Sequence, residues 1–167
     1  MKTSESGIEL IKKHEGFEPQ SYLDPAGLPT IGYGIYLNTP ELLEQYSGKT
    51  ITEQEATAML LDHVRNTIDP VIRDAVKVDI NQNQFNALAS FIYNIGSGAF
   101  RNSTLLSKIN SGASESEIRY QFSRWNKATV DGQLTELDGL TKRRKDEANL
   151  YFKIPLKKKF SSPRYYR

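Results

Sequence analysis

The chain of 167 residues contains no cysteine and only two histidines. Without cysteine the fold cannot depend on disulfide bonds, on Cys-ligated zinc or on a thiol nucleophile. The histidines, His14 and His63, lack the spacing of a metal site or of a catalytic triad, so both are expected to be structural or surface groups. We therefore expect neither a metal ion nor a cofactor.

Long apolar runs are also missing. No stretch reaches the roughly 18 apolar residues of a membrane-spanning helix, and the N-terminus lacks the apolar segment of about 7–15 residues that a signal peptide needs. We expect no stable membrane insertion. The remaining composition, with 38% apolar and 25% charged residues, is that of a globular chain forming one domain or two packed lobes.

The charge is unevenly distributed along the chain. Five of the 22 Lys/Arg residues fall in residues 157–167, which contain no Asp or Glu, so the body carries 17 Lys/Arg against 20 Asp/Glu. A mildly acidic body argues against nucleic acid as a partner, because such binding surfaces cluster basic residues. The basic, aromatic tail suggests instead a weak contact with anionic surfaces, with a frayed terminus as the alternative.

The first helix is predicted over residues 4–15, with Ser4 or Ser6 as N-cap and Gly16 as the stop. Ile8 and Ile11 share one face, and the spacing places Glu15 on that apolar face near the end of the helix. This is an unusual position for an acid.

Strands are expected only near the N-terminus. Residues 17–37 alternate aromatic and β-branched residues around the turn Asp24–Gly27, which predicts a hairpin or small sheet, and residues 38–50 read as loop. The other segments are predicted to be helices: one opened by the capping box Thr52–Glu55 and ended or kinked by Pro70, an apolar core helix after Asn81, and shorter helices over 103–109, after Ser114 and over 139–152. The order indicates an α+β fold with its strands segregated in an N-terminal lobe.

The residues suited to chemistry are concentrated in the stretch HEGFEPQSYLDPAGLPTIGYG. Cleavage of a glycosidic bond needs a protonated carboxyl and an ionised carboxylate. Apolar neighbours would favour the neutral acid at Glu15, whereas Asp24 beside a turn should stay solvated and ionised, and Thr30 could hold a water. Taken singly, each is better explained by structure, as a helix-end residue, a turn former and a strand residue, so the pair of acids alone is a weak signal.

The pattern around these residues resembles the phage lysozymes, the muramidase family of tailed-phage endolysins. Glu15, eight residues, Asp24, five residues and Thr30, followed by Ile31-Gly32-Tyr33-Gly34, is similar to the catalytic signature of the family. Two later blocks, 84–106 and 139–147, resemble its core helix and its closing helix. The three ordered blocks cover about residues 7–152.

The resemblance implies a mainly helical lysozyme-like fold with a cleft between two lobes. It implies a single catalytic domain over 1–156, with an N-terminal lobe at about 14–52, a helical lobe at about 70–154, and a tail at 157–167. It further implies an inverting hydrolysis of the β-1,4 bond between N-acetylmuramic acid and N-acetylglucosamine in peptidoglycan. Glu15 would be the acid, Asp24 the base and Thr30 an aid in placing the water, with substrate contacts at Tyr36, Tyr93 and Ser103.

On the same basis the protein is expected to be a monomer, made in the host bacterial cytoplasm and released to the wall through a separate membrane pore or secretion route. The sequence departs from the family where Ile35 replaces the usual His and where Arg119 replaces a smaller polar residue. Trp125 is expected to be a core or interlobe anchor. The cluster Lys142–Lys145 is typical of a solvated helix face, unless Arg143 or Arg144 reaches the cleft and contacts a carboxylate.

Three alternatives stay open at this point. A lytic transglycosylase would keep the acid and form an anhydro sugar, but Asp24 and Thr30 argue against it. A non-catalytic wall-binding protein could share the scaffold, since a fold alone does not fix activity, but the carboxylate pair argues against it. A secreted antibacterial effector would perform the same chemistry as an endolysin, so the sequence does not separate these two roles.

Overall fold

The computed structural model describes residues 1–156, so the weak anionic-surface contact expected of the basic tail 157–167 lies outside the described residues. The chain begins with helix α1 (Glu5–Glu15) and a three-stranded antiparallel sheet in the order β1 (Glu18–Leu23), β2 (Pro29–Gly32), β3 (Ile35–Tyr36). Nine further helical segments and a second hairpin follow within the described part. The predicted α+β fold is confirmed, and no described helix has the length and apolar character needed to span a bilayer.

The sequence predicted a loop over residues 38–50, but Pro40–Tyr46 within it form helix α2. Thr39 caps this helix by accepting a hydrogen bond from the Leu42 N–H at 3.2 Å, and Pro40 fits the first turn, where no backbone donor is needed. The local signal for α2 is therefore a capping residue followed by proline.

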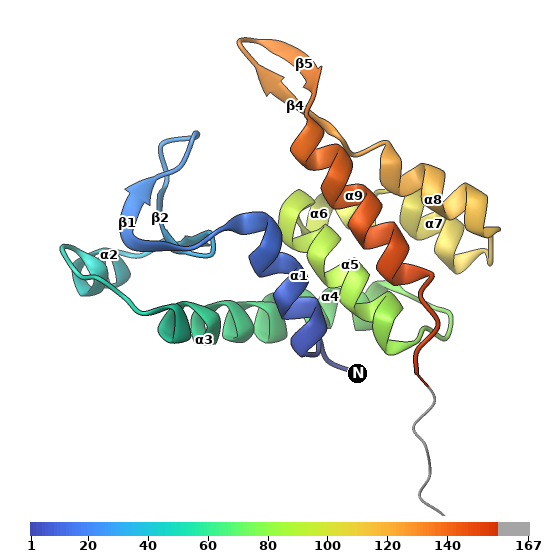
Figure 1. Ribbon diagram of the computed structural model, residues 1–167, viewed down its shortest axis with the longest axis horizontal. Helices are drawn as coiled ribbons and strands as arrows, with labels where there is room; N and C mark the ends of the chain where they lie inside the picture. The colour runs from blue at the N-terminus through green and yellow to red at the C-terminus, as the bar shows by residue number, and fades with distance from the viewer. Residues whose placement is uncertain (157–167) are drawn as a thin grey trace, which may run out of the picture.

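A long helical run connects the small sheet to the rest of the molecule (Figure 1). It comprises α3 (Glu53–His63), a π-helical turn η1 (Val64–Ile68) and α4 (Asp69–Ala75). Pro70 does not end the helix: the Asp69 N–H bonds the Val64 carbonyl across the π turn, and Pro70 then occupies the first turn of α4. Thr52 caps α3 through the Glu55 N–H, which forms half of the predicted capping box.

The core is built around helix α5 (Gln82–Ile95), in which eight consecutive residues from Phe85 to Ile92 are buried. This confirms the predicted central helix. It packs against α1 and the closing helix α9 (Asp138–Tyr151). Ser4 takes the N-cap position of α1, but its hydroxyl bonds the buried Asn86 side chain at 2.7 Å instead of capping the helix. A tertiary contact has replaced the local one.

The remaining helices are α6 (Ser97–Arg101), α7 (Thr104–Asn110) and α8 (Glu115–Ser123). The capping box at Ser114 is complete, with Glu117 returning a bond to the Ser114 N–H. The prediction that this half contains helices alone is wrong. Strands β4 (Lys127–Val130) and β5 (Gln133–Glu136) form a hairpin between α8 and α9, as Figure 1 shows.

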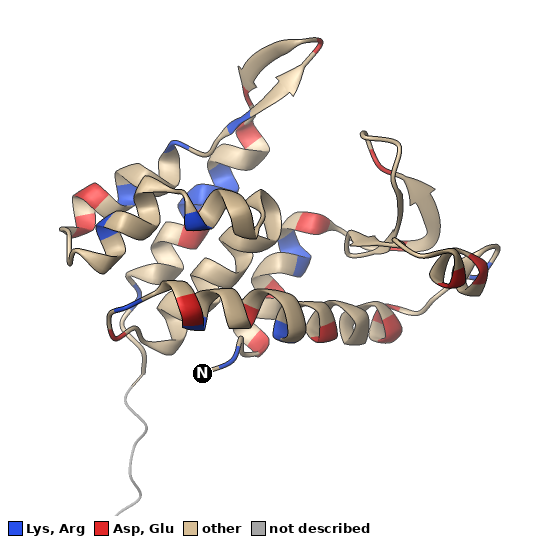
Figure 2. Cartoon of the chain, turned by 180° about the vertical axis from the view of Figure 1, so that it is seen from behind, with Lys and Arg blue, Asp and Glu red and all other residues tan. Residues whose placement is uncertain are grey.

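Acidic and basic residues gather on different helices. Asp and Glu residues lie along α2 and α3, while Lys and Arg are prominent around α9 (Figure 2). Two of the α9 cations, Arg143 and Arg144, are buried rather than solvated. Because an unpaired buried charge is costly, these guanidinium groups must have partners inside the protein.

Candidate active site

The candidate site begins at Glu15, the last residue of α1. Gly16 ends the helix with φ +73°, a conformation that favours glycine, and its N–H bonds the Lys12 carbonyl. The sequence predicted apolar groups around the Glu15 carboxyl, and this prediction is wrong. Its Oε1 accepts a hydrogen bond from Nη1 of the buried Arg143 at 2.5 Å.

Arg143 belongs to a buried ionic network that connects α1, α5 and α9. Its Nε bonds Glu147 Oε1 at 3.2 Å, and its Nη2 donates to the Ser90 carbonyl at 3.1 Å. Glu147 also accepts from Ser90 Oγ at 2.8 Å and from Arg144 Nη2 at 3.0 Å. Two carboxylates and two guanidinium groups balance one another in this network, so Arg143 is held in place when it contacts Glu15.

The other oxygen of Glu15 lies beside the turn between β2 and β3, which contains Tyr33 and Gly34. A Cβ built on Gly34 would lie 3.4 Å from Glu15 Oε2 and 3.4 Å from the Tyr93 hydroxyl, and Gly34 has φ +91°. Tyr93 itself donates to the Tyr33 carbonyl at 2.6 Å, and its burial raises its pKa strongly. Gly34 therefore allows the backbone to approach the Glu15 carboxyl without a side chain in between.

A hollow of about 250 Å³ opens at Glu15. His63 stands at its edge, with its ring edge-on to Tyr93 at 5.8 Å between centroids, and desolvation lowers the pKa of its imidazole. The lining residues come from α1, the end of the sheet, α3 and α5: Glu15, Gly34, Ile35, Tyr36, His63, Tyr93 and Asn94. Two of the predicted substrate contacts, Tyr36 and Tyr93, thus share one hollow with the predicted acid.

Asp24 and Thr30 are held together by the β1–β2 turn. Asp24 Oδ1 accepts from the Ala26 and Leu28 N–H groups at 2.9 and 2.8 Å, and Thr30 Oγ1 donates to the Leu28 carbonyl at 3.0 Å. Gly27 has φ +78° and closes the turn by donating to the Asp24 carbonyl. The backbone N–H of Leu28 therefore holds Asp24, and its carbonyl holds Thr30.

Tyr22 lies beside the predicted site residues, although its sequence context did not predict a role for it. It lies directly opposite Thr30 in the sheet register. Desolvation, followed by the negative charges of Glu18, Glu15 and Asp24, raises the pKa of Tyr22. The only sequence signal for Tyr22 was its position within residues 14–34, the stretch that contains Glu15, Asp24 and Thr30.

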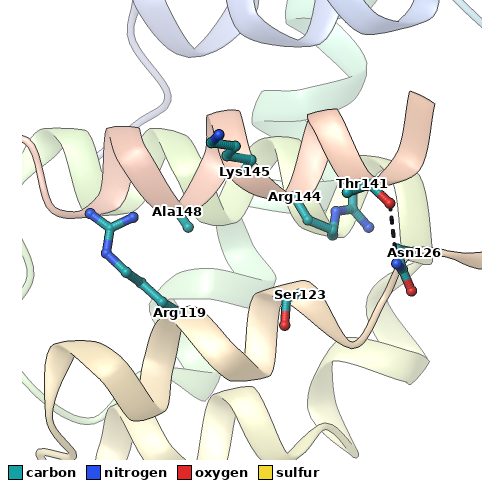
Figure 3. Close-up of a pocket in the computed structure, with 7 residues that line it drawn as sticks. All are labelled: Arg119, Ser123, Asn126, Thr141, Arg144, Lys145 and Ala148. Atoms are coloured by element: carbon teal, nitrogen blue, oxygen red, sulfur yellow. Dashed lines mark hydrogen bonds between the residues drawn. The ribbon is translucent and has the colours of Figure 1, made fainter. Parts of the chain in front are cut away.

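The other singled-out residues lie elsewhere. Ser103 caps α7 by accepting from the Leu106 N–H, donates to the Phe100 carbonyl, and lines a separate hollow with Trp125. Arg119 lines a groove between α8 and α9 (Figure 3) and pairs with Glu115 at 2.8 Å. Trp125 packs edge-on against Phe91 at 5.8 Å between centroids, in agreement with its predicted role as an anchor.

His14 is a structural group, as expected, bonded to Asp146 at 3.0 Å. Within residues 1–156, no three His, Asp or Glu side chains are grouped in a way that could hold a metal ion. The polar groups gathered around Glu15 are the Arg143 guanidinium, the Tyr93 hydroxyl and the His63 imidazole.

The family model described as phage lysozyme matches residues 12–147. The chain is 38% identical over 151 residues to an endolysin of Acyrthosiphon pisum secondary endosymbiont phage 1, covering 90% of this chain and 98% of that relative. It spans about half of some longer relatives, such as 54% of a Bacillus phage B103 endolysin, to which it is 37% identical.

Solved structures agree with this assignment. The endolysin from Escherichia coli O157:H7 phage FAHEc1 superposes with a TM-score of 0.79 at 36% identity, covering 91% of this chain and 94% of that one. The muramidase domain of SpmX from Asticaccaulis excentricus superposes with a TM-score of 0.81 at 34% identity, covering 92% and 99%. The chain belongs to the phage lysozyme family, and it is a lysozyme-type glycoside hydrolase, a muramidase endolysin that acts on peptidoglycan.

Proposed function

We propose that residues 1–156 form one catalytic domain that hydrolyses the β-1,4 bond between N-acetylmuramic acid and N-acetylglucosamine by an inverting mechanism. Glu15 is the general acid and Asp24 the general base. The observation that carries this proposal is that the two Glu15 oxygens have different surroundings. Oε1 is occupied by Arg143, while Oε2 lies on the side of Gly34, and Glu15 and Gly34 both line the hollow. Oε2 is therefore the atom that delivers the proton to the leaving oxygen.

The β1–β2 turn supplies the other half of the reaction. Backbone donors occupy Asp24 Oδ1, so Oδ2 is the oxygen that accepts a proton from the attacking water. The Thr30 hydroxyl donates its hydrogen to the Leu28 carbonyl, so it can only accept a hydrogen bond from a water. A water whose two hydrogens point to Asp24 and Thr30 keeps a lone pair free for the anomeric carbon.

Tyr36 and Tyr93 line the hollow and are proposed to contact the sugars there. Tyr36 is 47% exposed and offers a ring face, whereas Tyr93 is anchored to Tyr33 and shapes the wall. A contact of the substrate with Ser103 remains a prediction, and it would use the separate hollow beside Trp125.

The test compares Glu15→Gln and Asp24→Asn with the wild type on purified peptidoglycan. Each variant should fold normally and lose about 10²–10⁴-fold of its rate, the usual contribution of general acid–base catalysis. Glu9→Gln, an exposed position on the same helix, is the matched control and should keep full activity.

Product analysis separates the mechanisms. Inversion gives the α-anomer first, a retaining enzyme would give the β-anomer, and a lytic transglycosylase would give an anhydro sugar. Near-normal lysis by Glu15→Gln would refute the role of Glu15, and a first product other than the α-anomer would refute inversion.

A further inference from the structure

The hairpin between α8 and α9 has a well-defined turn but little support along its length. Asp131 and Gly132 at its tip have φ values of 49° and 77°, the combination that a two-residue type I′ hairpin turn requires. Neither β4 nor β5 packs extensively against another described element. Because an isolated two-stranded hairpin is marginal in water, contacts outside the chain would stabilise this one.

The base of this hairpin is firmly fixed to α9. The Leu137 N–H bonds the Asn126 carbonyl at 2.9 Å, and Asn126 Nδ2 donates to Thr141 Oγ1 at 3.1 Å, the dashed line in Figure 3. Arg144 adds a bond from Nη1 to the Trp125 carbonyl at 3.4 Å. The strands therefore project from a rigid root.

This root lies close to the catalytic acid. Helix α9 begins at Asp138, and Arg143 follows five residues later, about 7.5 Å along the helix axis. On the other side, β1 begins at Glu18, directly after Glu15 and its helix stop. The Glu15–Arg143 ion pair thus joins the roots of two hairpins, and Figures 1 and 2 show both hairpins projecting to the same side of the molecule.

The surface of the β4–β5 hairpin combines apolar and polar groups on each face. Leu134 is 70% exposed and lies opposite Thr129, while Val130 is 41% exposed and lies opposite Gln133. Opposed residues of an antiparallel pair share a face, so each of these two pairs presents one aliphatic side chain beside a hydroxyl or an amide. The pair Lys127–Glu136 lies on the same face as Leu134, and the pair Ala128–Thr135 lies on the same face as Val130. A sugar ring offers the complementary pattern of C–H faces and hydroxyl edges.

We infer that the β4–β5 hairpin is a second wall of the substrate cleft, opposite the β1–β2 hairpin, and that Val130 or Leu134 contacts the glycan strand of peptidoglycan. A four-residue strand extends about 13 Å, so the hairpin reaches well beyond the cleaved bond. The inference rests on the proposed function, because Glu15 defines where that bond lies. Its effect is on binding the polymer rather than on proton transfer.

The experiment uses the double variant Val130→Thr/Leu134→Thr, which removes the apolar contacts and places a β-branched side chain suited to a strand at both positions. On intact peptidoglycan sacculi and on glycan strands stripped of their peptides, kcat/KM should fall by about tenfold or more, through KM rather than kcat. Val78→Thr, an exposed valine between α4 and α5, is the matched control and should match the wild type on both substrates. Melting temperatures of all three proteins should agree.

Unchanged kinetics of the double variant on both polymers would overturn the inference. So would a loss confined to the peptide-bearing sacculi, because the contact would then be made to the stem peptide. Failure of the proposed function would look different: Glu15→Gln would retain activity whatever the hairpin variant did to KM.

Discussion

Glu147 offers the sharpest test of how the site is supported. Its side chain is fully buried, Oε1 receives three donors from Ser90, Arg143 and Arg144, and Oε2 lies 2.8 Å from Arg144 Nε. Glu147→Gln keeps the size of the side chain but removes its charge. It also points an amide donor, in either orientation, towards an arginine donor.

The expected loss is large because two buried guanidinium groups would then share one partly exposed carboxylate, Glu15, as their counter-charge. Removing one partner of a buried ion pair costs about 3–5 kcal/mol, against a total stability of about 5–15 kcal/mol for a domain. A protein of this size loses about 2–4 °C of Tm per kcal/mol, so Tm should fall by about 6–20 °C.

The assay is urea and thermal unfolding followed by circular dichroism, beside the same substitution at Glu9. Glu9 pairs with Lys12 at 3.0 Å, but its side chain is 59% exposed, so Glu9→Gln should cost about 0–1 kcal/mol. Unfolding free energies of the two variants within about 1 kcal/mol of each other would refute the reasoning that burial of the network sets its cost.

Two further predictions concern pH and backbone geometry. Burial, followed by the positive charge of Arg143, lowers the pKa of His14 despite its bond to Asp146, so the unfolded chain binds this proton more readily and stability falls as pH drops through about 6.5. His14→Gln should flatten part of the fall in Tm between about pH 8 and pH 5.5, and parallel curves would contradict this. Gly34→Ala places a Cβ in contact with Glu15 Oε2 and the Tyr93 hydroxyl, at a backbone position with a positive φ. This variant should lose much of its kcat while its Tm changes little. Full activity would show that the Glu15 carboxyl can move away from the added methyl group.

The sequence by itself determined the features whose cause is local. Gly16 and Ser114 act through backbone conformation and neighbouring donors, and the apolar residues from Phe85 to Ile92 mark a core helix wherever it packs. The spacing of Glu15, Asp24 and Thr30 likewise follows from one helix end and one turn. The Asp131-Gly132 turn was equally readable, and the hairpin was missed although its signal is short-range.

Only the tertiary structure decided what surrounds those residues. Arg143 is 128 positions from Glu15, and its cluster of basic neighbours reads as a solvated helix face until α9 packs against α1 and α5. Burial then forces both arginines to find carboxylates, which gives Glu15 a cationic partner where apolar neighbours were expected. Ser4 shows the same effect, because the buried amide of Asn86 takes the hydroxyl that a local cap would have used. Long-range packing decides such contacts, because the cost of an unpaired buried polar group exceeds the gain from a local hydrogen bond.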